Sequence, residues 1–152
     1  MINYKEKIIS GKSLGGFEIG KSIYDYLKNI YKNEISVSIK IYNEKSDKEI
    51  HSYSIDDNFI INTLPSGEIL NVTSMFRYEG TLNETIKCGM TVSEIKRVSK
   101  TQSILNGCLF LDSDHGFYFY LISPYDEIGD SIDHLPNDLI LNEITVCTPD
   151  LS

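Results

Sequence analysis

Two segments of the chain share one pattern, a glycine turn that leads into the start of a helix. In residues 13–26, and again in residues 81–95, a small hydroxyl residue and an extended piece precede a glycine. Each segment then contains a Ser/Thr-x-x-Asp/Glu signal, which begins at Ser22 in the first and at Thr91 in the second. The hydroxyl can accept from first-turn amides, and the acid faces the positive end of the helix dipole. The pattern therefore predicts two helices in corresponding positions.

Both segments continue with one apolar side. In the first, apolar residues recur three and four positions apart, at Ile23, Tyr26, Leu27, Ile30 and Tyr31. The second is shorter, and its apolar residues are Val92, Ile95 and Val98. This spacing is typical of amphipathic helices that pack against a core. We therefore expect both helices to lie on a sheet.

Strands are expected after each helix. Ile35, Val37, Ile39 and Ile41 alternate with polar residues, which predicts a half-buried antiparallel strand. Further strands are expected over residues 49–55, 58–64, 68–78, 103–111, 117–122 and 139–147, with turns at 65–67 and 112–116. A helix followed by antiparallel strands, occurring twice, predicts an α+β fold: a twisted antiparallel sheet with two helices on one face.

The composition supports a single folded domain rich in sheet. The 152 residues are 41% hydrophobic and 24% charged, which is ordinary for a globular chain. Neither Ala nor Trp occurs, and Ile, Tyr, Ser and Asn are abundant. This balance favours sheet over a helical bundle. We expect one domain over residues 1–152, with faint repeats at about 11–78 and 79–148.

Charge is distributed very unevenly along the chain. All 14 Lys and Arg fall in residues 1–100 with 13 of the 22 acids, which gives that part about +1. Residues 101–152 hold the other nine acids and no Lys or Arg, so that part is −9 and the whole chain −8. Nucleic acids and anionic membranes attract Lys and Arg, so neither is an expected partner. An oppositely charged protein is the partner that this asymmetry favours.

The expected location is the cytoplasm. The first residues lack the apolar run of a signal peptide, and no segment has the length of an apolar membrane span. The three cysteines, Cys88, Cys108 and Cys147, are odd in number and far apart. Such cysteines are typical of free thiols in a reducing compartment.

The sequence gives no convincing catalytic, cofactor or metal site, and we expect none. Gly11-Lys12-Ser13 lacks the upstream glycine of a phosphate-binding loop. The acids of residues 112–116 lack the spacing and the final glutamate of a calcium loop. Cysteine and histidine pairs with the local spacing of structural zinc ligands do not occur. Cys108 falls in a segment predicted to be a buried strand, where a thiol is inert.

The acidic last third is the candidate binding surface. Residues 123–138 hold five carboxylates, one tyrosine and three aliphatic residues that we expect to be exposed. Tyr118 and Tyr120 alternate with Phe117 and Phe119, so one pair should face the core and the other solvent. Aromatic anchors beside a charged rim are typical of protein interfaces. The expected contact residues are Asp112, Asp114, Tyr118, Tyr120, Tyr125, Asp126, Glu127, Asp130, Asp133 and Asp138. The alternative is a solvated acidic loop that only maintains solubility.

The chain also resembles a family of known role. With residues 13–22 (SLGGFEIGKS) and residues 78–91 (YEGTLNETIKCGMT), this small acidic chain resembles bacterial toxin-immunity proteins, including those of contact-dependent growth inhibition systems. The resemblance implies an inhibitor that is not an enzyme and that binds a cognate toxin domain, often a nuclease. A nuclease needs a basic cleft to hold phosphate, so an acidic inhibitor that covers the cleft is physically suitable.

Two other kinds of function stay open. The tyrosine-rich strands could line the pocket of a small ligand-binding or enzymatic domain, which would need a cavity with converging polar groups. The two helix-and-strand units could instead form a scaffold or adaptor. The expected assembly is a monomer or a weak homodimer.

Overall fold

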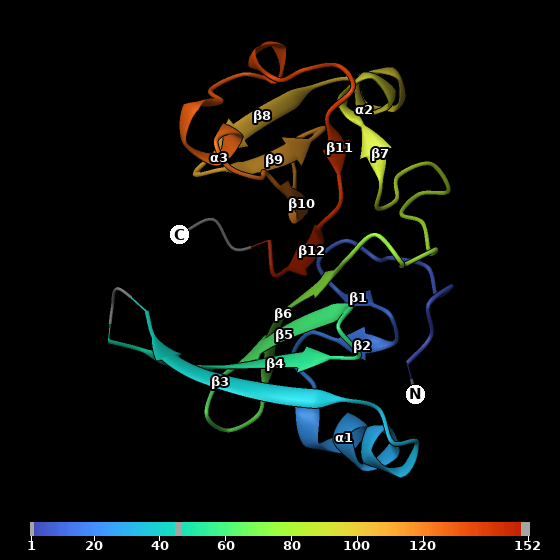
Figure 1. Cartoon of the computed structure of the whole chain (residues 1–152), viewed down its shortest axis with the longest axis vertical. Helices are drawn as coiled ribbons and strands as arrows, with labels where there is room; N and C mark the ends of the chain where they lie inside the picture. The colour runs from blue at the N-terminus through green and yellow to red at the C-terminus, as the bar shows by residue number, and fades with distance from the viewer. Residues whose placement is uncertain (1, 45–46, 150–152) are drawn as a thin grey trace.

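The computed structural model describes residues 2–44 and 47–149, and they form three sheets together with α-helices and a 3-10 turn (Figure 1). The first half contains β1 (Ser13–Leu14), β2 (Phe17–Glu18), α1 (Ile23–Lys32), β3 (Val37–Asn43), β4 (Glu49–Ile55), β5 (Phe59–Thr63) and β6 (Ile69–Ser74). The second contains β7 (Met90–Thr91), α2 (Val92–Val98), β8 (Gln102–Leu105), β9 (Cys108–Leu111), β10 (Asp114–Tyr120), α3 (Tyr125–Ile128), the 3-10 turn Ile132–His134, β11 (Ile140–Leu141) and β12 (Ile144–Cys147).

Eight of these strands form one antiparallel sheet in the order β3-β4-β5-β6-β12-β10-β9-β8. β1 pairs with β2, and β7 pairs with β11, in two small sheets. The α+β prediction is confirmed. Each half supplies one of the two longer helices and four neighbouring strands, and β6 meets β12 at the centre of the sheet (Figure 1). This order is compatible with two repeated units, although the repeat itself stays a prediction.

Both longer helices begin where the capping signals predict. The Ser22 hydroxyl accepts a hydrogen bond from the Tyr24 amide at the start of α1. At α2, the Thr91 hydroxyl accepts from the Glu94 amide, and the Glu94 carboxylate accepts from the Thr91 amide in return. This reciprocal pair satisfies two backbone donors that the first turn leaves unpaired. The helix starts therefore follow directly from local sequence.

The core lies between α1, α2, the β1–β2 hairpin and one face of the main sheet. One row of paired residues crosses this face on six strands: Ile55, Phe59, Ser74, Ile144, Phe119 and Leu109. All six are buried, and Phe59 packs against Phe17 and Tyr78 edge to face. Burial of this apolar surface is the main stabilising contribution to such a domain.

Several strand predictions need correction. The predicted half-buried strand is β3, where Ile39 and Ile41 are 51% and 59% exposed because β3 is a sheet edge. The strand predicted over residues 68–78 ends at Ser74. The single strand predicted over 103–111 is the β8–β9 hairpin, because Asn106 and Gly107 have positive φ and form its turn.

The end of the chain also differs from the sequence-based expectation. The turn predicted over residues 112–116 is shorter, since β10 already begins at Asp114 and both Asp112 and Ser113 have positive φ. The strand predicted over 139–147 divides into β11 and β12, which pair in different sheets. Within the described residues, no helix is long and apolar enough to cross a membrane.

Candidate binding surface

Exposed apolar side chains gather at the end of the sheet where β8, β9 and β10 lie together. Leu105 pairs with Cys108, and Cys108 pairs with Tyr120, so the three form one row across these strands. Ile122 lies two residues after the end of β10, and Ile128 lies on α3. Leu105, Tyr120, Ile122 and Ile128 are between 46% and 61% exposed. Together with Asp126, Glu127 and Asp130 we call this surface the α3 patch.

Close packing holds α3 against the β8–β9 turn. The Leu121 amide donates to the Gly107 carbonyl, and a Cβ on Gly107 would lie 3.1 Å from Cβ of Asp126. With its φ of +77°, position 107 requires glycine for both space and conformation. On the other side of the helix, Tyr125 packs against the core. Helix α3 is therefore fixed against the turn of the β8–β9 hairpin, with Asp126 at the contact (Figure 1).

The acids of the α3 patch differ in their surroundings. Glu127 and Asp130 are exposed, whereas Asp126 is half-buried against the turn. Its Oδ1 atom is buried and lacks a hydrogen-bond partner among the described residues. Apolar anchors with an acidic border have the composition of a protein-binding surface.

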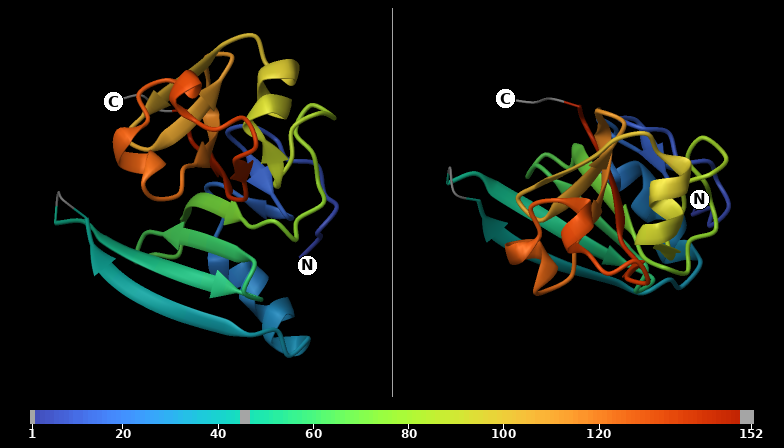
Figure 2. Two further views of the ribbon diagram at one scale, coloured as in Figure 1. Left: turned by 45° about the horizontal axis from the view of Figure 1, so that its top comes forward. Right: turned by 90° about the horizontal axis from the view of Figure 1, so that it is seen from above.

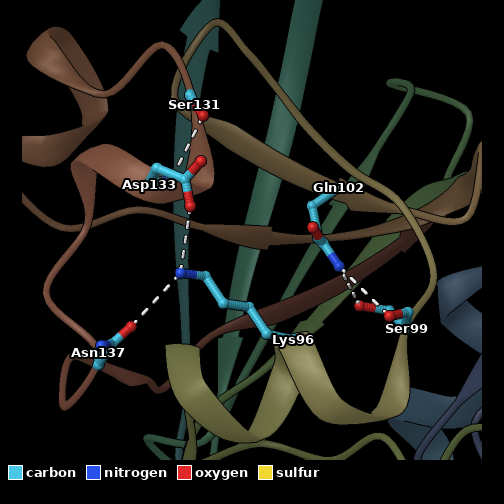
Figure 3. Close-up of polar contacts among 6 residues, drawn as sticks. All are labelled: Lys96, Ser99, Gln102, Ser131, Asp133 and Asn137. Carbon is cyan, nitrogen blue, oxygen red and sulfur yellow. Dashed lines mark hydrogen bonds and ion pairs between the residues drawn. The ribbon is translucent and has the colours of Figure 1, made fainter.

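One base from outside the acidic third reaches its loop. Lys96 Nζ lies 3.3 Å from Asp133 Oδ1 and 3.4 Å from the Asn137 side-chain oxygen (Figure 3). Asp133 is also held at the 3-10 turn, where its amide donates to the Ser131 hydroxyl. The segment 131–137 therefore crosses α2, and its charge is partly neutralised there. Because Lys96 already pairs with the Asp133 carboxylate, Asp133 is less available than the other predicted contact residues to bind a basic partner.

Two predicted contact residues hold the chain together locally. The Asp112 carboxylate accepts from the amides of Lys100 and Thr101, at 2.6 and 2.9 Å. Asp114 accepts from the Ser10 hydroxyl at 2.7 Å and from the Gly116 amide at 2.9 Å. In each acid the same oxygen, Oδ1, accepts both bonds, so that oxygen is less available to a partner. Both acids also lie outside the α3 patch as defined above.

The tyrosines of β10 lie on the sheet face that α1 and α2 do not cover. Phe117 and Phe119 are buried in the core, Tyr120 is exposed, and Tyr118 is half-buried. Burial raises the pKa of Tyr118 to about 12. The row of paired residues through Tyr118 on this face is uncharged: Ser38, Ser54, Ile60, Thr73, Thr145 and Tyr118. The predicted tyrosine pair thus divides into an exposed member in the α3 patch and a half-buried one beside it.

The three aliphatic residues of the loop 123–138 were expected to be exposed, but only one of them is exposed. Ile128 is exposed, whereas Ile132 and Leu135 are buried and belong to the core cluster. They anchor the 3-10 turn, and Ser131 caps it through the Asp133 amide. The expectation failed because the loop folds back over the sheet. Asp138, the last predicted contact, is exposed near β11, outside the α3 patch.

Among the hollows on the described surface are two whose lining does not include the tyrosine-bearing strand. One, of about 470 Å³, is lined by Lys7, Ile8, Ile9, Thr81, Asn83 and Glu84. The other, of about 360 Å³, is lined by Thr85, Lys87, Met90, Glu94, Arg97 and Val98. Both open broadly to solvent. They give no support to a tyrosine-lined pocket.

The described residues include free thiols and side chains of the types that bind metal ions. Cys108 is half-buried and not in a buried strand as predicted; burial raises its pKa to about 11. Burial also raises the pKa of Cys88 to about 11. Both thiols are therefore protonated near neutral pH and are weak nucleophiles. Among the described residues, no group of three His, Cys, Asp or Glu side chains could hold a metal ion.

Comparison of the chain with family models, curated proteins and solved structures gives no match.

The α3 patch includes four of the predicted contact residues, Tyr120, Asp126, Glu127 and Asp130. Tyr125 supports α3 from beneath. Sequence reasoning missed Leu105 and Ile122, which the structure places beside them. The Asn106-Gly107 pair was the available signal, because this dipeptide favours a two-residue hairpin turn. Such a turn would have placed Leu105 opposite Cys108.

Proposed function

We propose that this protein binds and neutralises a basic toxin domain, as an immunity protein does, and that the α3 patch is its main contact. The observation that carries the proposal is the grouping of four exposed apolar residues with exposed acids, in the third of the chain that lacks Lys and Arg. Apolar anchors supply affinity when a partner covers them, and a one-sign field selects the charge of that partner.

The electrostatics favour a basic protein over other ligands. Residues 101–149 carry no Lys, Arg or other fixed positive side chain, and only Lys96 is seen to reach their acids in the described ion pairs. An acidic field raises the association rate of a basic partner at low salt. It repels phosphate backbones and anionic lipid. A nuclease domain with a basic cleft would meet these requirements.

The test uses the basic C-terminal domain of the larger secreted protein that we expect a neighbouring gene to encode. We expect co-expression of the chain to protect cells from that domain, and the purified pair to form a complex. Its dissociation constant should increase as NaCl increases from 50 to 300 mM, because salt screens the charges. If the chain fails to bind the domain at 50 mM NaCl, the proposed function is wrong.

The charge-only alternative has a distinct outcome. If residues 123–138 serve solubility alone, replacing Tyr120 or Ile128 should leave both protection and complex formation unchanged. The proposed interface requires these apolar side chains, since they are the anchors of the α3 patch. Reduced protection with unchanged folding would favour the interface over the solvated loop.

A further inference from the structure

The edge strand β3 is a second surface, at the opposite end of the sheet from the α3 patch. In the described part of the chain it pairs with β4 alone, through seven residues from Val37 to Asn43. Seven residues of antiparallel strand extend roughly 24 Å. The outer backbone groups of such a strand can pair with another strand. The β3–β4 hairpin also projects from the body of the molecule (Figure 2).

The side chains of β3 alternate between an apolar and a polar face. Val37, Ile39 and Ile41 lie on the face that carries α1, and Ser38, Lys40 and Tyr42 lie on the other. Ile39 pairs with Tyr53, which is buried close to Tyr24 and Tyr31 of α1. Tyr24 and Tyr31 of α1 are both exposed, as are Ile39 and Ile41. These four residues form an uncovered apolar surface next to the strand edge.

We propose that this edge pairs with β3 of a second copy, in antiparallel register about Ile39, to form a homodimer. In this register Ile39 lies opposite its own counterpart, and Val37 lies opposite Ile41 of the other copy. Lys40 then faces Ser38. A register centred on Lys40 would instead place two ammonium groups directly opposite each other, which is unfavourable. The eight-stranded sheets of the two copies would continue through the shared edge.

The distribution of charge favours β3 over the other sheet edge for this contact. β3 and β8 are the two terminal strands of the sheet. β8 belongs to the acidic third, which carries −9, whereas β3 belongs to residues 1–100, which carry about +1. Pairing through β8 would bring two acidic regions together, and pairing through β3 keeps them at opposite ends. The dimer leaves the α3 patch open and does not depend on the proposed function.

Single cysteine variants test the register directly. In the proposed dimer, Ile39→Cys places two thiols opposite each other, within the Cα separation of about 7 Å that a disulfide allows. Ile41→Cys on its own places them four residues out of register, roughly 14 Å apart. We expect Ile39→Cys to form a disulfide-linked dimer on mild oxidation and Ile41→Cys to form none. A mixture of Val37→Cys and Ile41→Cys should form the mixed dimer.

The controls for this experiment come from the chain itself. Wild type is oxidised in parallel, because Cys108 and Cys147 are partly accessible and could give background dimer. Thermal unfolding of each variant checks that β3 still forms. If Ile41→Cys cross-links as fast as Ile39→Cys, or if Ile39→Cys gives only background, the proposed register is wrong.

Sedimentation velocity tests the association without cross-linking. We expect wild type to form more dimer as protein concentration increases, and also as NaCl increases, since salt screens the repulsion between two chains of −8. Ile39→Lys should be monomeric, because it places two Lys side chains opposite each other. If wild type sediments as a monomer up to 500 µM, the proposal is wrong. The proposal is also wrong if Ile39→Lys weakens toxin binding and leaves dimer formation unchanged, because β3 would then contact the toxin domain and not a second copy.

Discussion

Lys96 Nζ lies 3.3 Å from Asp133 Oδ1, and this contact joins helix α2 to the acidic loop (Figure 3). The pair explains why the acids of the last third are not equivalent. Asp133 lies beside a base, whereas Glu127 and Asp130 project from the molecule next to exposed apolar residues. The candidate surface is therefore narrower than the acidic third as a whole, and it is centred on α3.

Removing Lys96 should strengthen binding to a basic partner. Lys96→Ala makes the acidic loop one charge more negative, so we expect affinity for the toxin domain to increase several-fold at 50 mM NaCl. The free energy of unfolding should fall by less than about 1 kcal/mol, because the Asp133 side chain is 82% exposed. Lys28→Ala on α1 is the control of equal charge. Equal affinities for the two variants would show that the loop charge has no part in binding.

Asp112 should contribute to stability and not to binding. Its carboxylate accepts from two amides, and its φ is +54°, which disfavours most residues other than Gly, Asn and Asp. We expect Asp112→Ala to lower the free energy of unfolding by about 2–4 kcal/mol, measured by urea denaturation. Affinity for the toxin domain should be unchanged under conditions where the variant is folded. If Asp112→Ala is as stable as wild type but binds the toxin domain more weakly, Asp112 is a contact residue and the prediction is wrong.

Tyr78 should make the fold sensitive to alkaline pH. Its hydroxyl donates to the Glu6 carbonyl and accepts from the Gly15 amide at 3.0 Å. Burial raises the pKa of Tyr78 to about 12, above the value of about 10 for an unfolded tyrosine. The folded state therefore holds this proton more tightly, and its contribution is complete below pH 10 and lost as pH rises towards 12.

The variant Tyr78→Phe separates this contribution from those of the other tyrosines. We expect it to be about 1–3 kcal/mol less stable than wild type at pH 7, since two buried backbone groups lose their partner. Between pH 10 and 11 the free energy of unfolding of wild type should fall more steeply than that of Tyr78→Phe. The difference between the two slopes should be about 1 kcal/mol per pH unit. Parallel pH profiles from urea denaturation would contradict the assignment. Tyr4 and Tyr118, whose pKa values are also raised to about 12, should keep part of the slope in both proteins.

Tyr120 should act as an apolar anchor of the interface. It is exposed in the row with Leu105, and its removal should not disturb the core. We expect Tyr120→Ala to weaken binding of the toxin domain by about 10- to 100-fold, as found for central aromatic residues. Phe76→Ala is the control, because Phe76 is an exposed aromatic residue in the loop after β6. Similar affinities for both variants would exclude Tyr120 from the contact.

Local signals in the sequence predicted the helices and the alternating strands well. Thr91 and Glu94 form the capping box that their spacing indicates, and Phe117 and Phe119 face the core as the alternation requires. Sequence periodicity could not show which strand is an edge. Ile39 and Ile41 alternate like the core residues of β4, yet they are exposed because nothing in the described chain pairs beyond β3.

The residues of the candidate surface could not be predicted from local sequence patterns, because contacts between distant parts of the chain decide which of them are exposed. Ile128 and Ile132 lie in the same acidic loop, but only Ile132 is buried. The difference arises because the loop folds over the sheet after α3 and places the 3-10 turn against the core. The contact between Lys96 and Asp133 spans 37 positions and has no local signal. Tertiary packing thus decides which acids remain available.

The most direct test of the account is a charge reversal at the α3 patch with a matched reversal elsewhere. Glu127→Lys with Asp130→Lys changes the net charge by +4, and so does Glu68→Lys with Glu79→Lys, at exposed acids outside the acidic third. The measurement is the dissociation constant for the proposed toxin domain, which we expect a neighbouring gene to encode, at 50 mM NaCl, by titration calorimetry. We predict that the α3 reversal weakens binding about tenfold or more and that the matched reversal changes it much less. Equal effects of the two reversals, or none from the α3 reversal, would contradict the assignment of the α3 patch as the binding surface.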